Sequence, residues 1–335
     1  MGMGKTENLR LTLACWDYDR TRAIMENRVQ FDGIDLTYLN LVVEETFFRQ
    51  MRHHEFEVSE ISFSSYLVSL FQETPPFIGI PVFPSRSFRH SGIYINADAG
   101  IREPKDLIGK RIGCAEYQLT ANVWIRGILN DEYGVAPSSY TTFIGGLEEL
   151  GRVEKAALSL PPKITIERIG PAQTLAAMLE AGEIDALFSP RAPSTFTFGS
   201  GKVRRLFENA HTAEREYFER TRIFPIMHLV AIRRDVYERH RWVAQALCKG
   251  FAEAQRMAYD DLHQTAALKV MLPWLIQHLA DTEKLMGKDF WPYGCTPNLE
   301  AISRLLRYHH EQGLSQRQLT PQEIFAPETL ESYRI

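Results

Sequence analysis

An alternation of strand-like and helix-like segments, which occurs twice, constrains the fold of this 335-residue chain more than any other feature. In the first run, short apolar or alternating patterns predict strands over 9–14, 34–39, 56–61 and 77–83, and helical spacing predicts helices over 44–52 and 66–71. Strands that alternate with helices in this way form a parallel sheet with helices packed on its faces. The sequence therefore begins with a predicted α/β unit.

The same alternation starts again further along the chain. Strands are predicted over 111–115, 164–169 and 184–188. One helix is predicted from Thr120, as its N-cap, to Gly134, and another from Thr174 to Gly182. The last third of the chain changes to helical spacing, with Pro297 at the start of one helix. Two α/β units and added helices indicate two domains, which a chain of this length also favours.

Two extended, apolar segments flank the second unit, at 88–95 and 225–233. If both connect the lobes, the second unit is an insertion in the first. Lobe 1 then comprises 1–92 and 230–335, and lobe 2 comprises 93–229. This layout is that of type 2 periplasmic-binding-protein folds, which hold a ligand in a cleft between lobes. We therefore predict an α/β, two-lobed, type 2 periplasmic-binding-protein-like fold with a helical C-terminal extension.

Composition excludes several classes of partner. The formal net charge of −4 argues against a broad basic surface and so against nucleic acid as a partner. No apolar stretch approaches the roughly 18 residues of a membrane span. The first residues lack a secretory-signal pattern and the four cysteines have no paired spacing, so we expect reduced thiols and a cytoplasmic protein. Apolar residues of the last third, such as Trp274, Leu285 and Trp291, suit either core packing or a homo-oligomer contact.

Motifs for nucleotides and metals are absent from the sequence. The glycine-rich stretch 198–202 lacks the spacing of a phosphate loop, and there is no dinucleotide fingerprint or serine-hydrolase elbow. The adjacent histidine pairs at 53–54 and 309–310 point about 100° apart on a helix, so neither pair chelates one ion easily. We expect neither a metal site nor a cofactor.

Polar side chains gather in segments that follow predicted strands, where open α/β sheets bind ligands. The segments are 17–21, 60–65, 83–90, 116–120 and 190–194, with His228 on the second extended segment. Arginines in such places bind carboxylates, and hydroxyls at helix starts favour anions. The ordinary alternatives are solvated turns, N-caps, a surface charge cluster and a core histidine. The candidate binding residues are Asp19, Arg20, Ser64, Arg86, Arg89, Tyr117, Thr120, Arg191 and Ser194.

Several longer strings carry a resemblance to one family. They are YDRT (18–21), FPSRSFRH (83–90), EYQLTANVWIRG (116–127), GRVEK (151–155), PRAPS (190–194), IFPIMH (223–228) and DFWPYG (289–294). Together they resemble the 4,5-dihydroxyphthalate decarboxylase family over nearly the whole chain. The resemblance implies cofactor-independent loss of one carboxylate from a small aromatic dicarboxylate, 4,5-dihydroxyphthalate, to give protocatechuate.

Such a reaction needs an acid near a ring carbon, an acceptor for a hydroxyl proton and cations for the retained carboxylate. We expect His90 or His228 to donate the proton, and Glu60 or Glu116 to accept the hydroxyl proton. Arg20 and Arg86 would bind the carboxylate with help from Arg191, and Ser64 and Thr120 would add hydrogen bonds. A solute-binding protein, either a transport receptor or a cytosolic sensor, is the main alternative on the same fold, and a thiamine-precursor protein is a weaker one.

Overall fold

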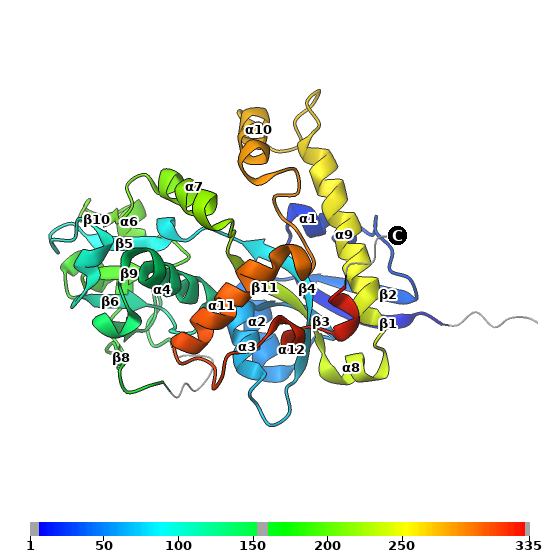
Figure 1. Cartoon of the computed structure of the whole chain (residues 1–335), viewed down its shortest axis with the longest axis horizontal. Coiled ribbons are helices and arrows are strands. Elements are labelled where there is room, and N and C mark those ends of the chain that lie inside the picture. Colours follow the sequence, from blue (N-terminus) through cyan, green and yellow to red (C-terminus); the bar gives the residue numbers. More distant parts are fainter. Residues whose placement is uncertain (1–6, 153–159, 332–335) are drawn as a thin grey trace, which may run out of the picture. The chain divides into compact units, whose positions relative to one another are not determined.

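The computed structural model describes residues 7–152 and 160–331, which form two compact units (Figure 1). Unit 1 comprises Met1–Ser85, His228–Ile302 and Thr320–Ile335, and unit 2 comprises Arg86–Met227 and Ser303–Leu319. The boundaries of these units differ from those of the lobes predicted from the sequence, and residues 303–319 belong to unit 2. The assignment of lobes remains a prediction.

Unit 1 is built on a five-stranded sheet in the order β2-β1-β3-β11-β4. The strands are β1 (Leu9–Cys15), β2 (Ile34–Asn40), β3 (Val58–Ser62), β4 (Phe77–Arg86) and β11 (Ile226–Arg233). β1 pairs in parallel with β2 and β3, but β11 lies between β3 and β4 and runs antiparallel to β3. The predicted parallel pairing holds for β1, β2 and β3, but β11 makes the sheet a mixed one. Local periodicity cannot reveal that a strand from far along the chain takes a central position.

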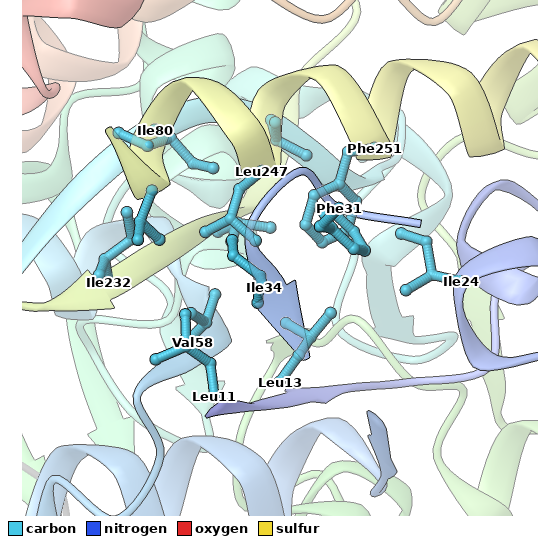
Figure 2. Close-up of a cluster of buried hydrophobic side chains, with 14 of the residues drawn as sticks. Leu11, Leu13, Ile24, Phe31, Ile34, Val58, Ile80, Ile232, Leu247 and Phe251 are labelled. Atoms are coloured by element: carbon cyan, nitrogen blue, oxygen red, sulfur yellow. The ribbon is translucent and has the colours of Figure 1, made fainter. Parts of the chain in front are cut away.

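Helices α1 (Asp19–Met25) and α9 (Val243–Leu262) pack on one face of this sheet. Figure 2 shows Leu247 and Phe251 of α9 above strand residues such as Leu13 and Ile34, and all four are almost fully buried. Burial of one large apolar side chain contributes about 1.5–3 kcal/mol, so this cluster is a major source of the stability of unit 1. The other helical elements of unit 1 are α2 (Val43–His53), α3 (Phe63–Ser69), α8 (Arg234–Arg239), α10 (Leu275–Met286), α12 (Pro321–Ile324), η4 (Thr296–Asn298) and η5 (Pro327–Thr329).

Unit 2 has a six-stranded sheet in the order β10-β5-β9-β6-β7-β8. The strands are β5 (Ile93–Asn96), β6 (Arg111–Cys114), β7 (Thr141–Ile144), β8 (Thr165–Arg168), β9 (Ala186–Phe188) and β10 (Val203–Arg205). The pairs β9–β6, β6–β7 and β7–β8 are parallel, whereas β5 is antiparallel to both β9 and β10. The helices are α4 (Thr120–Tyr133), α5 (Leu175–Ala181), α6 (Ser194–Thr197), α7 (Ala210–Thr221), most of α11 (Leu299–Glu311), η1 (His90–Gly92), η2 (Pro104–Leu107) and η3 (Pro137–Ser139).

Sequence signals for helix ends predicted some boundaries correctly and others incorrectly. Thr174 caps α5 by accepting a hydrogen bond from the Ala177 amide, and Gly182 ends that helix in the left-handed conformation, as predicted. Thr120 is not an N-cap, because Leu119 holds that position and Thr120 is the first helical residue. The helix expected over 66–71 begins at Phe63. The segment 88–95 is not continuously extended, because η1 interrupts it.

Two further observations concern the whole described chain. None of its described helices is long and apolar enough to cross a membrane. Within the described residues none of the four cysteines forms a disulfide, and Cys15, Cys114 and Cys295 are buried.

Candidate active site

The Glu60 carboxylate on β3 is the centre of a buried polar cluster in unit 1. Its side chain has 0% exposure, and Oε1 lies 2.6 Å from Nδ1 of His228 and 2.7 Å from the hydroxyl of Tyr18. Oε2 accepts a hydrogen bond of 3.3 Å from the Trp16 amide and lies 3.6 Å from Sγ of Cys15. Every acceptor position of the carboxylate is therefore occupied by a protein donor.

Strand pairing brings these residues together. Glu60 is opposite Val230 in the antiparallel β3–β11 ladder, and His228 is opposite Ser62. Side chains two residues apart on a strand share a face, so Glu60 and His228 are diagonal neighbours on one face. Tyr18 follows the carboxyl end of β1, the parallel neighbour of β3. The cluster thus lies where two parallel strands end.

Electrostatics keep Glu60 ionised. Burial by itself would raise the pKa of Glu60, but the hydrogen bonds from His228, Tyr18 and the Trp16 amide outweigh it and lower the pKa below its ordinary value. Burial and the same carboxylate raise the pKa of Tyr18, which therefore remains a protonated donor. Because Glu60 is an anion, Nδ1 of His228 carries the proton between them, and Nε2 is the nitrogen that can exchange a proton with a ligand. Phe47 packs edge-on against the imidazole at 4.8 Å.

Arg20 is clamped between two aromatic rings beside this cluster. Its guanidinium carbon lies 4.2 Å from the ring centre of Tyr18 and 4.2 Å from that of Trp291. Nε donates to the Pro84 carbonyl at 2.6 Å, and Nη1 donates to Asp19 at 2.9 Å. These ring contacts and hydrogen bonds restrict the orientation of the guanidinium, and Nη2 makes no hydrogen bond to any described residue.

Trp291 is itself held in place by three hydrogen bonds. Its indole nitrogen donates to the Phe83 carbonyl at 2.8 Å, and its amide donates to the Tyr259 hydroxyl at 2.9 Å. Its carbonyl accepts from the Gln255 side chain at 2.7 Å. A pocket of about 130 Å³ adjoins Arg20 and is lined by Asp19, Arg20, Gln255, Ala258, Tyr259, Leu262, Phe290 and Trp291.

Sequence analysis named Asp19, Arg20, Glu60 and His228, and the structure brings these four together in unit 1. It did not single out Tyr18 or Trp291. The position of Tyr18 directly after a strand was a usable signal, whereas nothing local indicates that Trp291 covers Arg20. Ser64, the other candidate in unit 1, is fully buried in the first turn of α3.

The remaining candidates lie in unit 2. Glu116, 1% exposed, accepts two hydrogen bonds from Arg152 through Oε1, at 3.1 and 2.6 Å. Tyr117 is buried with its ring 3.8 Å from the guanidinium of Arg126, and Thr120 is buried in the first turn of α4. Arg152 and Arg126 are partners that sequence analysis did not single out.

The arginine–histidine segment after β4 is mostly buried within unit 2. Arg86 donates to the Phe224 carbonyl at 3.0 Å, and Nε of Arg89 lies 3.1 Å from the sulfur of Met227. Burial lowers the pKa of Arg89 to about 10. His90 lies against Phe207 and Tyr217, and neither of its ring nitrogens has a hydrogen-bond partner among the described groups. Burial, with Arg220 nearby, lowers the pKa of His90 to about 4, so its imidazole is neutral at pH 7.

Arg191 and Ser194 lie after β9 and are exposed. The amide of Ser194 donates to Glu148 at 2.7 Å and its hydroxyl donates to the same carboxylate at 2.9 Å. The amide of Arg191 donates to the Ser189 hydroxyl at 3.2 Å. Within the described residues, no three His, Cys, Asp or Glu side chains are placed to hold a metal ion.

Solved structures share the fold at low sequence identity. The periplasmic aliphatic sulphonate-binding protein SsuA from Escherichia coli is 12% identical with a TM-score of 0.52, covering 96% of this chain and 99% of its own. A periplasmic sulfonate-binding protein from Methylobacillus flagellatus has a TM-score of 0.55 at 13% identity, covering 96% and 93%. DSZB in complex with biphenyl-2-sulfinic acid has a TM-score of 0.51 at 15% identity, covering 96% and 97%. These likenesses confirm the predicted periplasmic-binding-protein-like fold.

Sequence comparison identifies the family. No family model matches the chain. The 4,5-dihydroxyphthalate decarboxylase of Comamonas testosteroni is 44% identical over 327 residues, which are 98% of this chain and 99% of that protein. That of Pseudomonas putida is 45% identical over 210 residues, 63% of this chain and 81% of that protein. With this identity over nearly its full length, the chain belongs to the 4,5-dihydroxyphthalate decarboxylase family.

Proposed function

We propose that this protein decarboxylates 4,5-dihydroxyphthalate to protocatechuate, with His228 as the proton donor. The observation that carries the proposal is the contact in which Oε1 of the buried Glu60 carboxylate lies 2.6 Å from Nδ1 of His228. Membership of the decarboxylase family supplies the substrate and the reaction. The pair supplies the acid that the reaction needs.

The substrate itself provides the electrons. Each of its carboxylates is para to a ring hydroxyl, which can push electron density onto the carbon that bears the carboxylate. A proton from the enzyme bonds to that carbon and the para hydroxyl loses its proton, which gives a dienone. The bond between that ring carbon and the carboxylate then breaks, and carbon dioxide leaves. The bonding electrons restore the aromatic ring as a phenolate, whose oxygen takes back a proton to give protocatechuate.

His228 is suited to deliver the proton. In the imidazolium form, Nδ1 donates to Glu60 while Nε2 offers its proton to the ring carbon. After transfer the neutral ring keeps its Nδ1 proton, which is directed at Glu60, so Nε2 is the nitrogen that changes protonation. Since His228, Tyr18 and Trp16 occupy Glu60, we assign Glu60 to positioning of His228, and solvent water takes the hydroxyl proton.

Arg20 is the cation that we assign to the retained carboxylate. Arginine and carboxylate form short, directional hydrogen bonds, and a guanidinium fixed before binding loses little entropy when it binds. The aromatic rings of Tyr18 and Trp291 fix Arg20 in this way. Phe290 and Tyr259 line the pocket beside Arg20 and suit an aromatic ligand.

Purified protein mixed with 4,5-dihydroxyphthalate tests the reaction, with carbon dioxide and protocatechuate measured together. We expect one of each per substrate consumed. Loss of a general acid costs about 10²–10⁴-fold in rate, so His228→Gln should lower kcat on that scale while the exposed control His211→Gln does not. Tight binding without turnover by the unaltered protein would instead support a solute-binding protein. Full turnover by His228→Gln would remove His228 from its proposed role.

We also propose that the enzyme works in the cytoplasm, where the predicted aromatic dicarboxylate substrate would reach it after uptake. The absence of a disulfide among the described cysteines supports a reducing compartment. Fractionation of cells that express the complete natural gene tests this location, and recovery in the periplasmic fraction would contradict it.

A further inference from the structure

Arg126, in the middle of α4, is a buried cation without an acidic partner among the described residues. Its side chain is 1% exposed. Nε donates to the Gln312 side chain at 2.7 Å and Nη2 donates to the Tyr117 carbonyl at 2.6 Å, both of them neutral groups. Nη1 is buried and has no hydrogen-bond partner in the described part of the chain. Buried charges in proteins are ordinarily paired, since removing a charge from water is costly.

A cavity of about 220 Å³ lies beside this arginine, within unit 2. Its lining comprises Arg126, Gly127, Asn130, Ala136, Pro137, Ser138, Lys163, Ile164, Glu311 and Gln312. Lys163 adds a second positive charge. Both oxygens of Glu311, the one carboxylate of this lining, accept hydrogen bonds from Nη1 of Arg307, at 2.9 and 3.0 Å. The lining therefore carries an excess of positive charge.

We propose that this cavity binds a small organic carboxylate, with Arg126 as its buried counter-charge and Lys163 as a second cation. An anion there would supply the partner that Arg126 lacks. The volume indicates the size of the ligand, because a cavity of about 150 Å³ can take a benzene ring. The cavity has apolar walls, formed by Ala136, Pro137 and Ile164, which an inorganic ion would leave in contact with water. Hydrogen-bonding groups are provided by Asn130 and Ser138.

The lining of this cavity shares no residue with the Glu60 cluster of unit 1, and in unit 2 Arg126 bonds the candidate residue Tyr117. Ser138 precedes β7, and Ile164 immediately precedes β8, so this part of the lining is at the amino ends of parallel strands. Glu116 and Arg191 follow the carboxyl ends of β6 and β9, at the opposite edge of the same sheet. The proposal does not depend on the reaction that we propose, and its test requires no turnover.

Benzoate is the probe, and calorimetric titration is the measurement. Because benzoate could also bind at Arg20, the titration uses the Arg20→Gln protein as its background. We expect one benzoate site in Arg20→Gln and none when Arg126→Met is added. Adding Lys163→Met should weaken the affinity by about three- to tenfold. The matched control Lys249→Met, an exposed lysine of unit 1, should leave the affinity unchanged.

Circular dichroism verifies that the Arg126→Met protein is folded. If it is not, the Lys163 variant carries the test, because Lys163 is exposed and its substitution leaves the core intact. Equal benzoate affinity with and without Arg126, or with and without Lys163, would overturn the proposal. Absence of benzoate binding in Arg20→Gln would show that water alone fills the cavity. Binding of inorganic phosphate or chloride without benzoate would refute an organic carboxylate as the ligand.

Discussion

At the scale of single residues, Glu60 is the side chain that organises the candidate site. It is fully buried, and its hydrogen bonds to His228 and Tyr18 join the sheet to the residues after β1. A carboxylate in this position does two things that an amide of the same shape cannot. It accepts from His228 without offering an N–H group in return, and its charge orients the imidazole.

Replacement of Glu60 by glutamine tests this positioning role. We expect Glu60→Gln to lower kcat by about 10²–10⁴-fold with little change in KM, because the acid is lost while the substrate contacts remain. Glu60→Asp should recover part of the rate. The control Glu57→Gln removes a neighbouring carboxylate that bonds Thr12 and Arg233, and it should keep kcat. A rise in KM without a fall in kcat would contradict the assignment.

Trp291 offers a second test at this scale. Without the indole, Arg20 loses the cover of one face, and a cation–π contact is worth roughly 0.5–2 kcal/mol. Trp291→Leu should raise KM by about 3–30-fold with kcat nearly unchanged, and Trp291→Phe should restore most of the affinity. Protocatechuate should inhibit Trp291→Leu more weakly, while catechol, which lacks a carboxylate, should inhibit both proteins equally. Equal weakening of inhibition by protocatechuate and by catechol would instead indicate a general loss of structure. Trp242→Leu, which removes a different tryptophan, is the control variant.

His90 makes the protein sensitive to acid. Its pKa is lowered from 6.5 to about 4 in the folded protein by burial and by Arg220. Between these two pKa values the unfolded chain binds a proton at His90, whereas the folded protein does not. The stability that His90 contributes is therefore present above pH 6.5 and is lost as the pH falls towards 4. The loss is about 3 kcal/mol. Urea unfolding at pH 7, 5.5 and 4.5 should show a shallower loss in His90→Leu, and identical slopes would contradict this account.

At the scale of elements, α9 depends on close contact with the loop before β2. A Cβ added to Gly250 would lie 2.2 Å from the ring of Phe31, which is itself buried. Glycine is a poor helix former, by about 1 kcal/mol relative to alanine, so its presence mid-helix is explained by this contact.

Gly250→Ala should therefore lower the free energy of unfolding by about 1–3 kcal/mol, because overpacking outweighs the gain in helix propensity. Lys249→Ala, one residue earlier and exposed, is the matched control and should change stability little. Chemical denaturation measures both. A more stable Gly250→Ala protein would show that Phe31 moves aside without cost.

At the scale of the whole molecule, the sequence leaves core packing and a homo-oligomer contact open for the last third of the chain, and an exposed apolar segment of unit 1 leads us to expect the contact. The exposed large residues of this segment are Leu268, Val270, Met271, Leu272, Trp274 and Ile276. Apolar side chains gathered in this way are unusual on the surface of a monomer. We expect light scattering to find an oligomer that Met271→Asp combined with Trp274→Asp dissociates, without loss of helical signal. An unaltered protein that is monomeric would contradict the prediction.

Features that neighbouring residues determine could be predicted from the sequence. The alternation of strands and helices, the Thr174 cap and the Gly182 end of α5 follow from periodicity and from preferences within a few residues. Four members of the Glu60 cluster and its surroundings were also identified, because polar residues after parallel strands gather at one edge of a sheet.

Only the tertiary structure decided which distant residues meet. β11 enters the sheet beside β3 from 168 positions along the chain, as the Glu60–His228 contact shows, and this makes the sheet mixed. Trp291 covers Arg20, and Gln312 meets Arg126 across 186 positions, yet no local pattern announces either contact. The physical reason is that periodicity and capping act over a few residues, whereas burial selects partners by their proximity in the folded chain. The sequence by itself therefore determined the segments and their chemistry, and packing decided that Glu60 holds His228.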